Sequence, residues 1–284
     1  MTDSQRRLTE VLDKVTSGPK KSLGQNFLVS DVVIGRIIDA AKNYEFEHLI
    51  EVGPGPGSIT HFLKDLTSNF TAVELDREWA EYWRSEGIKI IEGDALQLNW
   101  QDLIKPKTLL VSNLPYQISS SIVIDRCLDA VPLLGMVLMF QKEVAQKIRG
   151  EVGSDNYGFL TVMAQSFWKI HFVSEAGPRD FFPPPKVASR VLRFVRVTEE
   201  DCPANPQDYL QFVKQAFSQR RKTLRSNWES YLNQKRPGMW PEVLKTVMSW
   251  GFSEKLRAEE LSPGQFMDLY KNCYLGKDTP LVIS

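Results

Sequence analysis

The feature that most constrains this chain is a series of short apolar runs separated by longer, more polar segments. The runs are rich in Val, Ile and Leu and lie at residues 48–52, 71–73, 88–91, 108–111 and 136–140. Runs of this length and composition are typical of buried β-strands. The segments between them are long enough for crossover helices, and this alternation is typical of a doubly wound parallel sheet. The sequence therefore predicts an α/β fold.

Further elements are predicted on both sides of this series. Apolar residues at helical spacing predict a helix over residues 31–41, with Ser30 or Asp31 as its N-cap. Alternating side chains predict a long strand over 187–197. We expect this strand to run antiparallel to a neighbour at 170–174 and to close one edge of the sheet.

The domain organisation follows from a break in composition. An acidic, proline-bearing segment over 199–206 separates the predicted sheet from a C-terminal part with helical spacing. We therefore predict a polar, mobile N-terminal tail at 1–20, a sheet-containing domain at 21–198 and a smaller α-helical domain at 199–284. Helices beyond the sheet are expected at 159–168, 209–217, 240–250 and 263–270.

Composition excludes several classes of protein. Of the 284 residues, 42% are hydrophobic and 25% are charged, which is typical of a folded globular chain. The longest apolar stretches, such as 133–140, are too short for a transmembrane helix, and residues 1–20 lack the apolar segment of a secretory signal. A cytoplasmic location without membrane association is therefore expected.

Cysteine and histidine usage argues against disulfide bonds and metal sites. The three cysteines are widely spaced without a CxxC pair, and the three histidines show no ligand spacing. We therefore expect a reducing compartment and no bound metal. The residues concerned are Cys127, Cys202, Cys273, His48, His61 and His171.

The charged residues are unevenly distributed although they cancel overall, with 35 Lys and Arg against 35 Asp and Glu. Residues 45–102 hold 12 acidic and 4 basic residues, whereas 179–196 hold 5 basic and 1 acidic, and 201–236 hold 7 basic and 3 acidic. The basic segments fit a polyanion such as a nucleic acid. The alternative is that they are ordinary solvated faces.

A glycine-rich turn follows the first predicted strand. Residues 53–57 read Gly-Pro-Gly-Pro-Gly and precede a segment that can begin a helix. A strand, a glycine turn and a helix N-terminus form a common nucleotide-binding corner. However, the third glycine comes one residue too early for the dinucleotide fingerprint, and the two prolines lack the N–H groups that would bind a pyrophosphate. The loop therefore favours a ligand other than NAD or FAD.

Two acidic residues at later strand ends indicate the kind of ligand. Glu74 stands 21 residues after Gly53, where an acidic side chain usually accepts hydrogen bonds from ribose hydroxyls. Asp94 follows the next strand and can accept from an adenine amino group. Acidic walls suit a nucleoside without phosphates, and S-adenosylmethionine with its cationic sulfonium suits them better still. The alternative is that these are unrelated turns.

A tetrapeptide after the fourth predicted strand has the chemistry of an amine-binding corner. It reads Asn113-Leu114-Pro115-Tyr116 and falls at the carboxyl edge of the predicted sheet. The Asn113 side-chain oxygen and the Leu114 carbonyl, held by the rigid proline, can accept both protons of an adenine amino group. Tyr116 offers a ring on which the base can stack. Attack on a sulfonium methyl group needs mainly alignment and no metal; the alternative is an ordinary turn.

Eight segments together resemble the family of ribosomal RNA adenine N6,N6-dimethyltransferases. The resemblance implies a Rossmann-like, class I S-adenosylmethionine-dependent methyltransferase domain with a smaller helical C-terminal domain. It also implies methyl transfer from S-adenosylmethionine to adenine N6. The segments occur in the family's order at 21–28, 51–57, 74–76, 93–95, 113–116, 141–145, 181–187 and 220–224.

The resemblance also implies roles for individual residues. Leu114, Pro115 and Tyr116 complete the reactive corner begun by Asn113, and Phe181 would hold the extruded adenine against Tyr116. The alternative for Phe181 is an anchor of the proline-rich loop that follows it. The implied cofactor contacts are Asn26, Leu28, Gly53, Gly55, Glu74, Asp94 and Asn113.

The basic run at 220–224 resembles the small-subunit branch of the family. That likeness implies a monomeric enzyme that dimethylates two adjacent adenosines in the hairpin loop near the 3′ end of 16S rRNA, in the assembling 30S subunit. Two alternatives stay open: adenine N6 methylation of large-subunit RNA or DNA, and a non-catalytic assembly or transcription factor of the same fold. RNA contacts are expected from Lys20, Lys21, Lys142, Lys147, Arg149, Lys186, Arg220, Arg221, Lys222 and Arg225.

Overall fold

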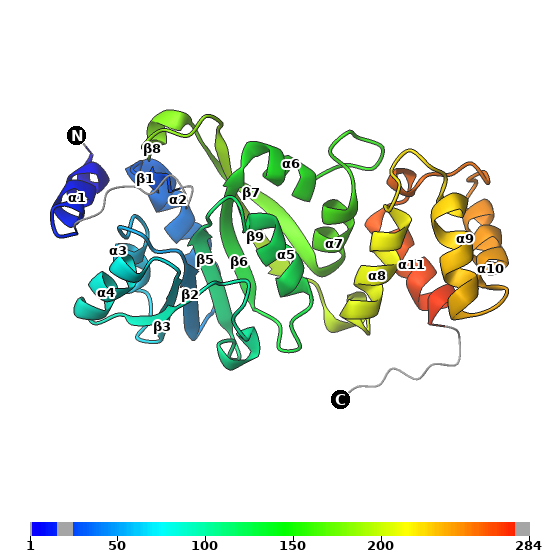
Figure 1. Ribbon diagram of the computed structural model, residues 1–284, viewed down its shortest axis with the longest axis horizontal. Coiled ribbons are helices and arrows are strands. Elements are labelled where there is room, and N and C mark those ends of the chain that lie inside the picture. The colour runs from blue at the N-terminus through cyan, green and yellow to red at the C-terminus, as the bar shows by residue number, and fades with distance from the viewer. Residues whose placement is uncertain (1, 16–24, 276–284) are drawn as a thin grey trace. The chain divides into compact units, whose positions relative to one another are not determined.

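The computed structural model describes residues 2–15 and 25–275, and its strands and helices are labelled in Figure 1. In this part of the chain the strands are β1 Phe27–Leu28, β2 His48–Val52, β3 Phe70–Glu74, β4 Lys89–Glu92, β5 Thr108–Asn113, β6 Gly135–Gln141, β7 Trp168–Ala176, β8 Phe181–Phe182 and β9 Ser189–Arg196. The α-helices are α1 Asp3–Leu12, α2 Asp31–Lys42, α3 Thr60–Leu63, α4 Arg77–Ser85, α5 Ser119–Cys127, α6 Lys142–Ile148, α7 Phe159–Phe167, α8 Pro206–Ala216, α9 Leu224–Lys235, α10 Met239–Ser249 and α11 Pro263–Leu269.

The predicted parallel sheet is confirmed. Among the described residues, seven strands form one sheet in the order β4-β3-β2-β5-β6-β9-β7. The strands from β4 to β6 run parallel, and β9 runs antiparallel to β6. The strand order reverses between β2 and β5, which is the point at which such sheets bind ligands. The five apolar runs are β2 to β6, and the expected helix at 31–41 is α2 with Ser30 as its N-cap.

Buried aliphatic side chains join α2 to one face of this sheet. Because successive strand residues point to opposite faces, Leu109 and Val111 of β5 face α2, and Leu110 faces the other side. Burial on both faces explains why the strands read as continuous apolar runs. The α2 side of the core includes Ile34, Ile37, Ala41, Leu49, Leu109, Val111, Val137 and Met139.

The strand predicted over 187–197 is present as β9 and is a neighbour of β7, as expected. It does not form the edge of the sheet, because it lies between β6 and β7 and leaves β7 outermost. β9 pairs with β6 along most of its length, from Ser189 opposite Gln141 to Val195 opposite Gly135.

The described residues group into two compact units. Unit 1 falls within 1–145 and 169–196, and unit 2 falls within 146–168 and 197–284. The change at 196–197 lies two residues before the predicted boundary at 198–199. The segment 146–168, which contains α7, belongs to unit 2 because α7 packs against α8 and α11. This grouping was not expected from the sequence.

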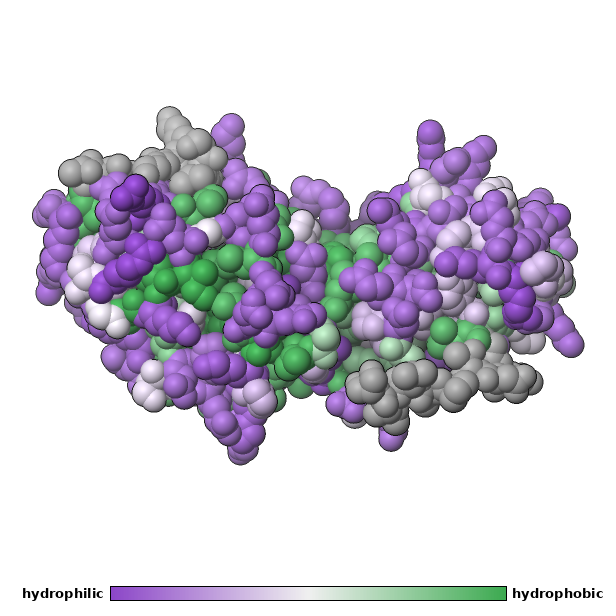
Figure 2. All heavy atoms as spheres, turned by 60° about the horizontal axis from the view of Figure 1, so that its bottom comes forward, coloured by the Kyte–Doolittle hydropathy of each residue, from purple (hydrophilic) through white to green (hydrophobic). Residues whose placement is uncertain are grey.

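Unit 2 has an aromatic core. Phe212 stacks on Trp228 with ring centroids 4.4 Å apart, and Tyr209 meets Tyr270 edge-on. The hydroxyl of Tyr209 also lies 2.7 Å from the hydroxyl of Ser166 on α7, and both residues are buried. On the face shown in Figure 2, the side chains over α8 to α11 are mostly hydrophilic, whereas apolar patches appear over unit 1.

The N-terminal segment contains a helix, which corrects the expectation of a mobile tail over residues 1–20. Thr2 caps α1: its hydroxyl accepts from the Gln5 N–H, and the Gln5 side chain accepts from the Thr2 N–H. Two apolar side chains of α1 then enter a buried cluster that the sequence did not reveal. The cluster contains Leu8, Val11, Phe27, Val29, Trp79, Tyr82 and Trp83. Residues 1 and 16–20 of the predicted tail lie outside the described residues.

We predict that Leu8→Ala lowers the free energy of unfolding by about 2 kcal/mol, because it removes a buried aliphatic side chain and leaves a cavity. Urea denaturation measures the change. Glu10→Ala, on the exposed side of the same helix, is the matched control and stays within about 0.5 kcal/mol of wild type. Equal effects of the two substitutions would contradict the packing of α1.

Candidate active site

One cleft gathers most of the predicted site residues at the carboxyl edge of the parallel strands. It encloses about 1000 Å³, part of which is open to solvent. Apart from Asn26, which precedes β1, the residues come from the turn after β2, the end of β3, the turn after β4 and the end of β5, and these four strands are neighbours in the sheet. The predicted residues that line the cleft are Asn26, Gly53, Gly55, Glu74, Asp94, Asn113, Leu114, Pro115 and Tyr116.

The glycine turn after β2 depends on glycine at each of its three positions. Gly53, Gly55 and Gly57 have φ of +68°, +49° and +88°, which L side chains rarely adopt. A Cβ at Gly57 would lie 2.3 Å from the ring of Trp83, and the Trp83 Nε1 donates to the Gly55 carbonyl at 2.7 Å. A Cβ at Gly53 would lie 3.3 Å from Cδ of Pro115. The turn is therefore held by Trp83 on one side and touches the Asn113–Tyr116 corner on the other.

Glu74 lies at the end of β3 as a buried carboxyl group on the cleft wall. Its Oε2 accepts from the Gly55 N–H at 3.1 Å, and its Oε1 accepts from the Asp76 N–H at 2.8 Å. Burial raises the pKa of Glu74, and the two backbone donors oppose the shift. Asp94 forms a turn in which its Oδ1 accepts from the Leu96 N–H at 2.9 Å. Both carboxyl groups are thus oriented by backbone amides.

Glu51 is a cleft residue that sequence reasoning did not single out. It lies inside β2, is 1% exposed and lines the cleft. Its Oε2 is buried without a hydrogen-bond partner among the described residues. Burial, and to a lesser extent the nearby Glu74, raises the pKa of Glu51 to about 8. An acidic residue within an otherwise apolar strand was the signal that could have revealed it.

We predict that Glu51→Gln flattens the pH dependence of stability between about pH 5 and pH 8. The folded protein holds a proton on Glu51 that the unfolded chain releases near pH 4.5, so stability falls as pH rises through this window. The limiting slope is about 1.4 kcal/mol per pH unit for one proton. Urea denaturation at several pH values measures it. Glu10→Gln serves as an exposed control. If the slope of stability against pH were unchanged in Glu51→Gln, Glu51 would not hold a proton in the folded protein.

The corner at the end of β5 presents polar acceptors to the cleft. Asn113 is the last residue of β5, and its Nδ2 donates to the Asn26 carbonyl at 3.4 Å. The amide oxygen of Asn113 is therefore the group that can accept a hydrogen bond from a substrate. Leu114 is 2% exposed, and Pro115 contacts the glycine turn, so the peptide between them is closely held.

Tyr116 completes the corner with a half-buried ring on the cleft wall. Its hydroxyl lies 2.8 Å from the hydroxyl of Ser189 on β9, and its carbonyl accepts from the Ser119 hydroxyl at 2.9 Å. Burial raises the pKa of the Tyr116 phenol, so the hydroxyl is neutral at physiological pH.

The structure does not bring Leu28 and Phe181 into the cleft. They are cross-strand partners in the β1–β8 pair, so their side chains share a face. That face is the core: Leu28 is 1% exposed, Phe181 is 4% exposed, and both belong to the cluster that packs on α2. Neither residue lines the cleft, and the stacking role of Phe181 stays a prediction. Phe27, which the sequence did not single out, lines the cleft, and a Cβ at Gly55 would lie 3.4 Å from its ring.

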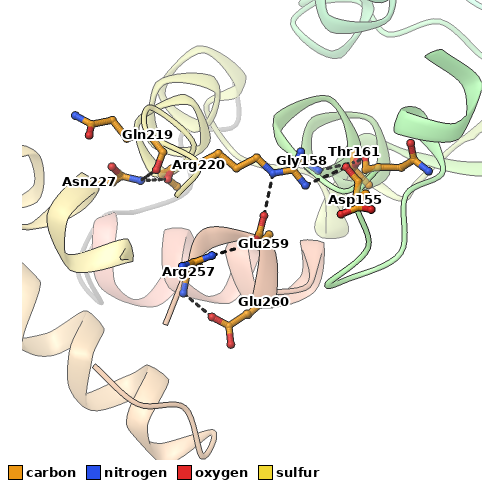
Figure 3. A network of polar contacts seen from close by, with 11 residues as sticks. Asp155, Gly158, Thr161, Gln219, Arg220, Asn227, Arg257, Glu259 and Glu260 are labelled. Carbon is orange, nitrogen blue, oxygen red and sulfur yellow. Dashed lines mark hydrogen bonds and ion pairs between the residues drawn. The ribbon is translucent and has the colours of Figure 1, made fainter. Parts of the chain in front are cut away.

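The predicted RNA-contacting residues differ in their surroundings. Lys142 lies 3.3 Å from Glu175, and Arg225 lies 3.0 Å from Glu229. Arg220 belongs to a network in unit 2 in which it donates to Glu259 and to the Asp155 carbonyl, both at 2.9 Å (Figure 3). Exposed ion pairs of this kind contribute little to stability. Lys147, Arg149, Lys186, Arg221 and Lys222 are exposed, and Lys20 and Lys21 lie outside the described residues.

None of the helices in residues 2–15 and 25–275 has the length and apolar character that a membrane span requires. Within the same ranges, no group of three or more His, Cys, Asp or Glu side chains is arranged to hold a metal ion.

Comparison with known proteins identifies the family. A model of the family described as ribosomal RNA adenine dimethylase matches residues 17–273. The chain belongs to this family. It is an rRNA adenine dimethyltransferase, and its fold is that of the Rossmann-like methyltransferases, as the sequence predicted.

Individual relatives of the dimethylase family cover nearly the whole chain. A ribosomal RNA small subunit methyltransferase A from Bdellovibrio bacteriovorus is 54% identical, covering 96% of this chain and 98% of its own. One of the same name from Natranaerobius thermophilus is 34% identical, covering 95% and 97%. Among solved structures, a dimethyladenosine transferase from Plasmodium falciparum matches with a TM-score of 0.72 at 25% identity, covering 86% and 96%. The 23S rRNA methyltransferase ErmE matches with a TM-score of 0.65 at 26% identity, covering 88% and 100%.

Proposed function

We propose that this dimethylase uses S-adenosylmethionine to methylate N6 of two adjacent adenosines in the hairpin loop near the 3′ end of 16S rRNA. Its substrate is the assembling 30S subunit, and it acts as a monomer in the cytoplasm. The observation that carries the cofactor assignment is the charge of the cleft. Among the described residues that line it, the carboxylic acids are Glu51, Glu74 and Asp94, and none is Lys, Arg or His. Burial raises the pKa of Glu51 to about 8, so Glu51 adds a polar group to the wall rather than a charge near neutral pH.

A cleft of this charge fits a cationic nucleoside and not a pyrophosphate. Acidic walls without a cation repel phosphates and attract a sulfonium. The glycine turn also allows a ligand to approach the backbone closely. The Oε2 of Glu51, which has no hydrogen-bond partner among the described residues, offers such a ligand a polar contact. When bound, S-adenosylmethionine supplies a methyl group on a positively charged sulfur. Glu74 would accept from its ribose hydroxyls and Asp94 from its adenine amino group.

The Asn113–Tyr116 corner would hold the substrate adenine. The amide oxygen of Asn113 and the carbonyl of Leu114 accept hydrogen bonds from the two N–H groups of N6, which favours the pyramidal, more nucleophilic amine. The ring of Tyr116 stacks against the extruded base. The corner therefore acts by alignment and hydrogen bonding and requires no general base from the chain.

The small-subunit assignment is supported by the relatives. The two relatives described above at 54% and 34% identity carry small-subunit names, and the basic run at 220–224 lies in the helical unit 2. Exposed Arg221 and Lys222 suit contacts with the phosphate backbone of RNA.

We predict that Asn113→Ala lowers the rate of methyl transfer by about 100-fold or more, because it removes one acceptor of the N6 protons. Labelled methyl transfer from S-adenosylmethionine to unmethylated 30S subunits measures it, and mass spectrometry locates the modified adenosines. Asn43→Ala is the control, since Asn43 also donates to a backbone carbonyl but lies outside the cleft. A near wild-type rate for Asn113→Ala would overturn the corner's role. Preferred modification of 50S subunits or duplex DNA would overturn the small-subunit assignment.

We predict that Lys222→Ala weakens binding to 30S subunits and reduces the slope of log Kd against log salt concentration by about 0.7 to 0.9, the loss expected for one phosphate contact. Filter binding at several salt concentrations measures the slope. Lys245→Ala is the control, because Lys245 is exposed on α10 outside the basic run. The same slope in the wild type, Lys222→Ala and Lys245→Ala would exclude Lys222 from the RNA interface.

A further inference from the structure

We propose that Ser189 is a positioning residue, which holds the ring of Tyr116 in the orientation that the target adenine stacks upon. The inference rests on the stacking role proposed above for Tyr116. It assigns a function in the reaction to a serine that does not line the cleft and that belongs to none of the motifs from which the site was predicted.

Ser189 is held in a fixed position by the sheet. It is the first residue of β9 and is fully buried. Its backbone pairs with Gln141 of β6, so the position of its hydroxyl is set by the sheet and not by a loop. The distance of 2.8 Å to the Tyr116 hydroxyl is that of a well-formed hydrogen bond between two hydroxyl groups.

Tyr116 is held at both ends. Its carbonyl accepts from Ser119 at the start of α5, and its hydroxyl meets Ser189 at the start of β9. The preceding Pro115 has a restricted φ and contacts Gly53. A ring anchored in this way keeps one orientation before the base arrives, so stacking does not require further loss of rotamer freedom.

The hydroxyl of Tyr116 is not needed for stacking itself. Stacking uses the face of the ring, and a phenylalanine offers an equivalent face. The hydroxyl adds only a polar group in half-buried surroundings, which costs free energy unless it has a partner. Ser189 is that partner in the structure. The hydroxyl of Tyr116 therefore serves to form this hydrogen bond, and the bond fixes the orientation of the ring.

The test is a double-mutant cycle in the full-length enzyme with unmethylated 30S subunits and labelled S-adenosylmethionine. Ser189→Ala and Tyr116→Phe each delete the hydrogen bond, and each is expected to lower kcat about three- to tenfold, the range expected for one hydrogen bond. The Kd for 30S subunits stays unchanged because the phosphate contacts are intact. The double variant is expected to be no slower than either single variant. Additive losses, or an unchanged kcat in both single variants, overturn the proposal.

A matched control separates positioning from stability. Ser166 and Tyr209 form a buried hydroxyl pair, 2.7 Å apart, within unit 2 and outside the cleft. Ser166→Ala and Tyr209→Phe are expected to lower the melting temperature without changing kcat of the folded enzyme. If Ser189→Ala behaves in the same way, Ser189 is merely structural. If Ser189→Ala fails to fold, Tyr116→Phe deletes the same bond without altering β9 and decides the question.

Failure of this inference is distinguishable from failure of the proposed function. Tyr116→Ala removes the ring and is expected to abolish most methyl transfer. Full activity of Tyr116→Ala would remove the stacking role on which both proposals depend. Loss of activity in Tyr116→Ala with a wild-type kcat in Ser189→Ala and Tyr116→Phe would remove only the role of Ser189.

Discussion

The arrangement of the cleft depends on how closely Gly53 approaches Pro115. A side chain at position 53 would begin 3.3 Å from the proline ring, on a backbone whose φ of +68° already favours glycine. β2 and β5 are neighbours in the sheet, so the turn after one strand meets the corner after the other with no side chain between them. Just before this contact, the Ser112 hydroxyl donates to the Val52 carbonyl at 2.5 Å. The glycine turn and the Asn113–Tyr116 corner are therefore one closely packed assembly.

Trp83 extends this support to the outer side of the glycine turn. Its indole N–H binds the Gly55 carbonyl, and its ring occupies the space where a Cβ of Gly57 would lie. The same ring belongs to the cluster that buries Leu8 and Val11 of α1. A helix that looks unimportant in the sequence thus packs against the element that shapes the cleft.

The sheet and the corner could be predicted because their signals are local. A strand buried on both faces reads as a continuous apolar run, and the Asn113–Tyr116 motif directly follows such a run. The features that the sequence did not predict, such as the burial of α1 and of Phe181, depend on residues distant in sequence. The burial of α1 is decided by aromatic residues on α4. Phe181 and Phe182 alternate in direction, and only the register of β8 against β1 decides that Phe181 enters the core while Phe182 stays 49% exposed.

The division of the chain into units has a consequence for how the enzyme can be shortened. The chain passes between the units three times, and α7 reaches unit 2 before β7 and β9 complete the sheet of unit 1. Val162, Met163 and Phe167 of α7 are fully buried, in a helix that packs on α8 and α11. A catalytic fragment that ends at residue 198 would expose this apolar helix to water and invite aggregation. Separating the two units by deletion would require excising 146–168 as well and rejoining the end of unit 1 at residue 145 to β7 through a new linker.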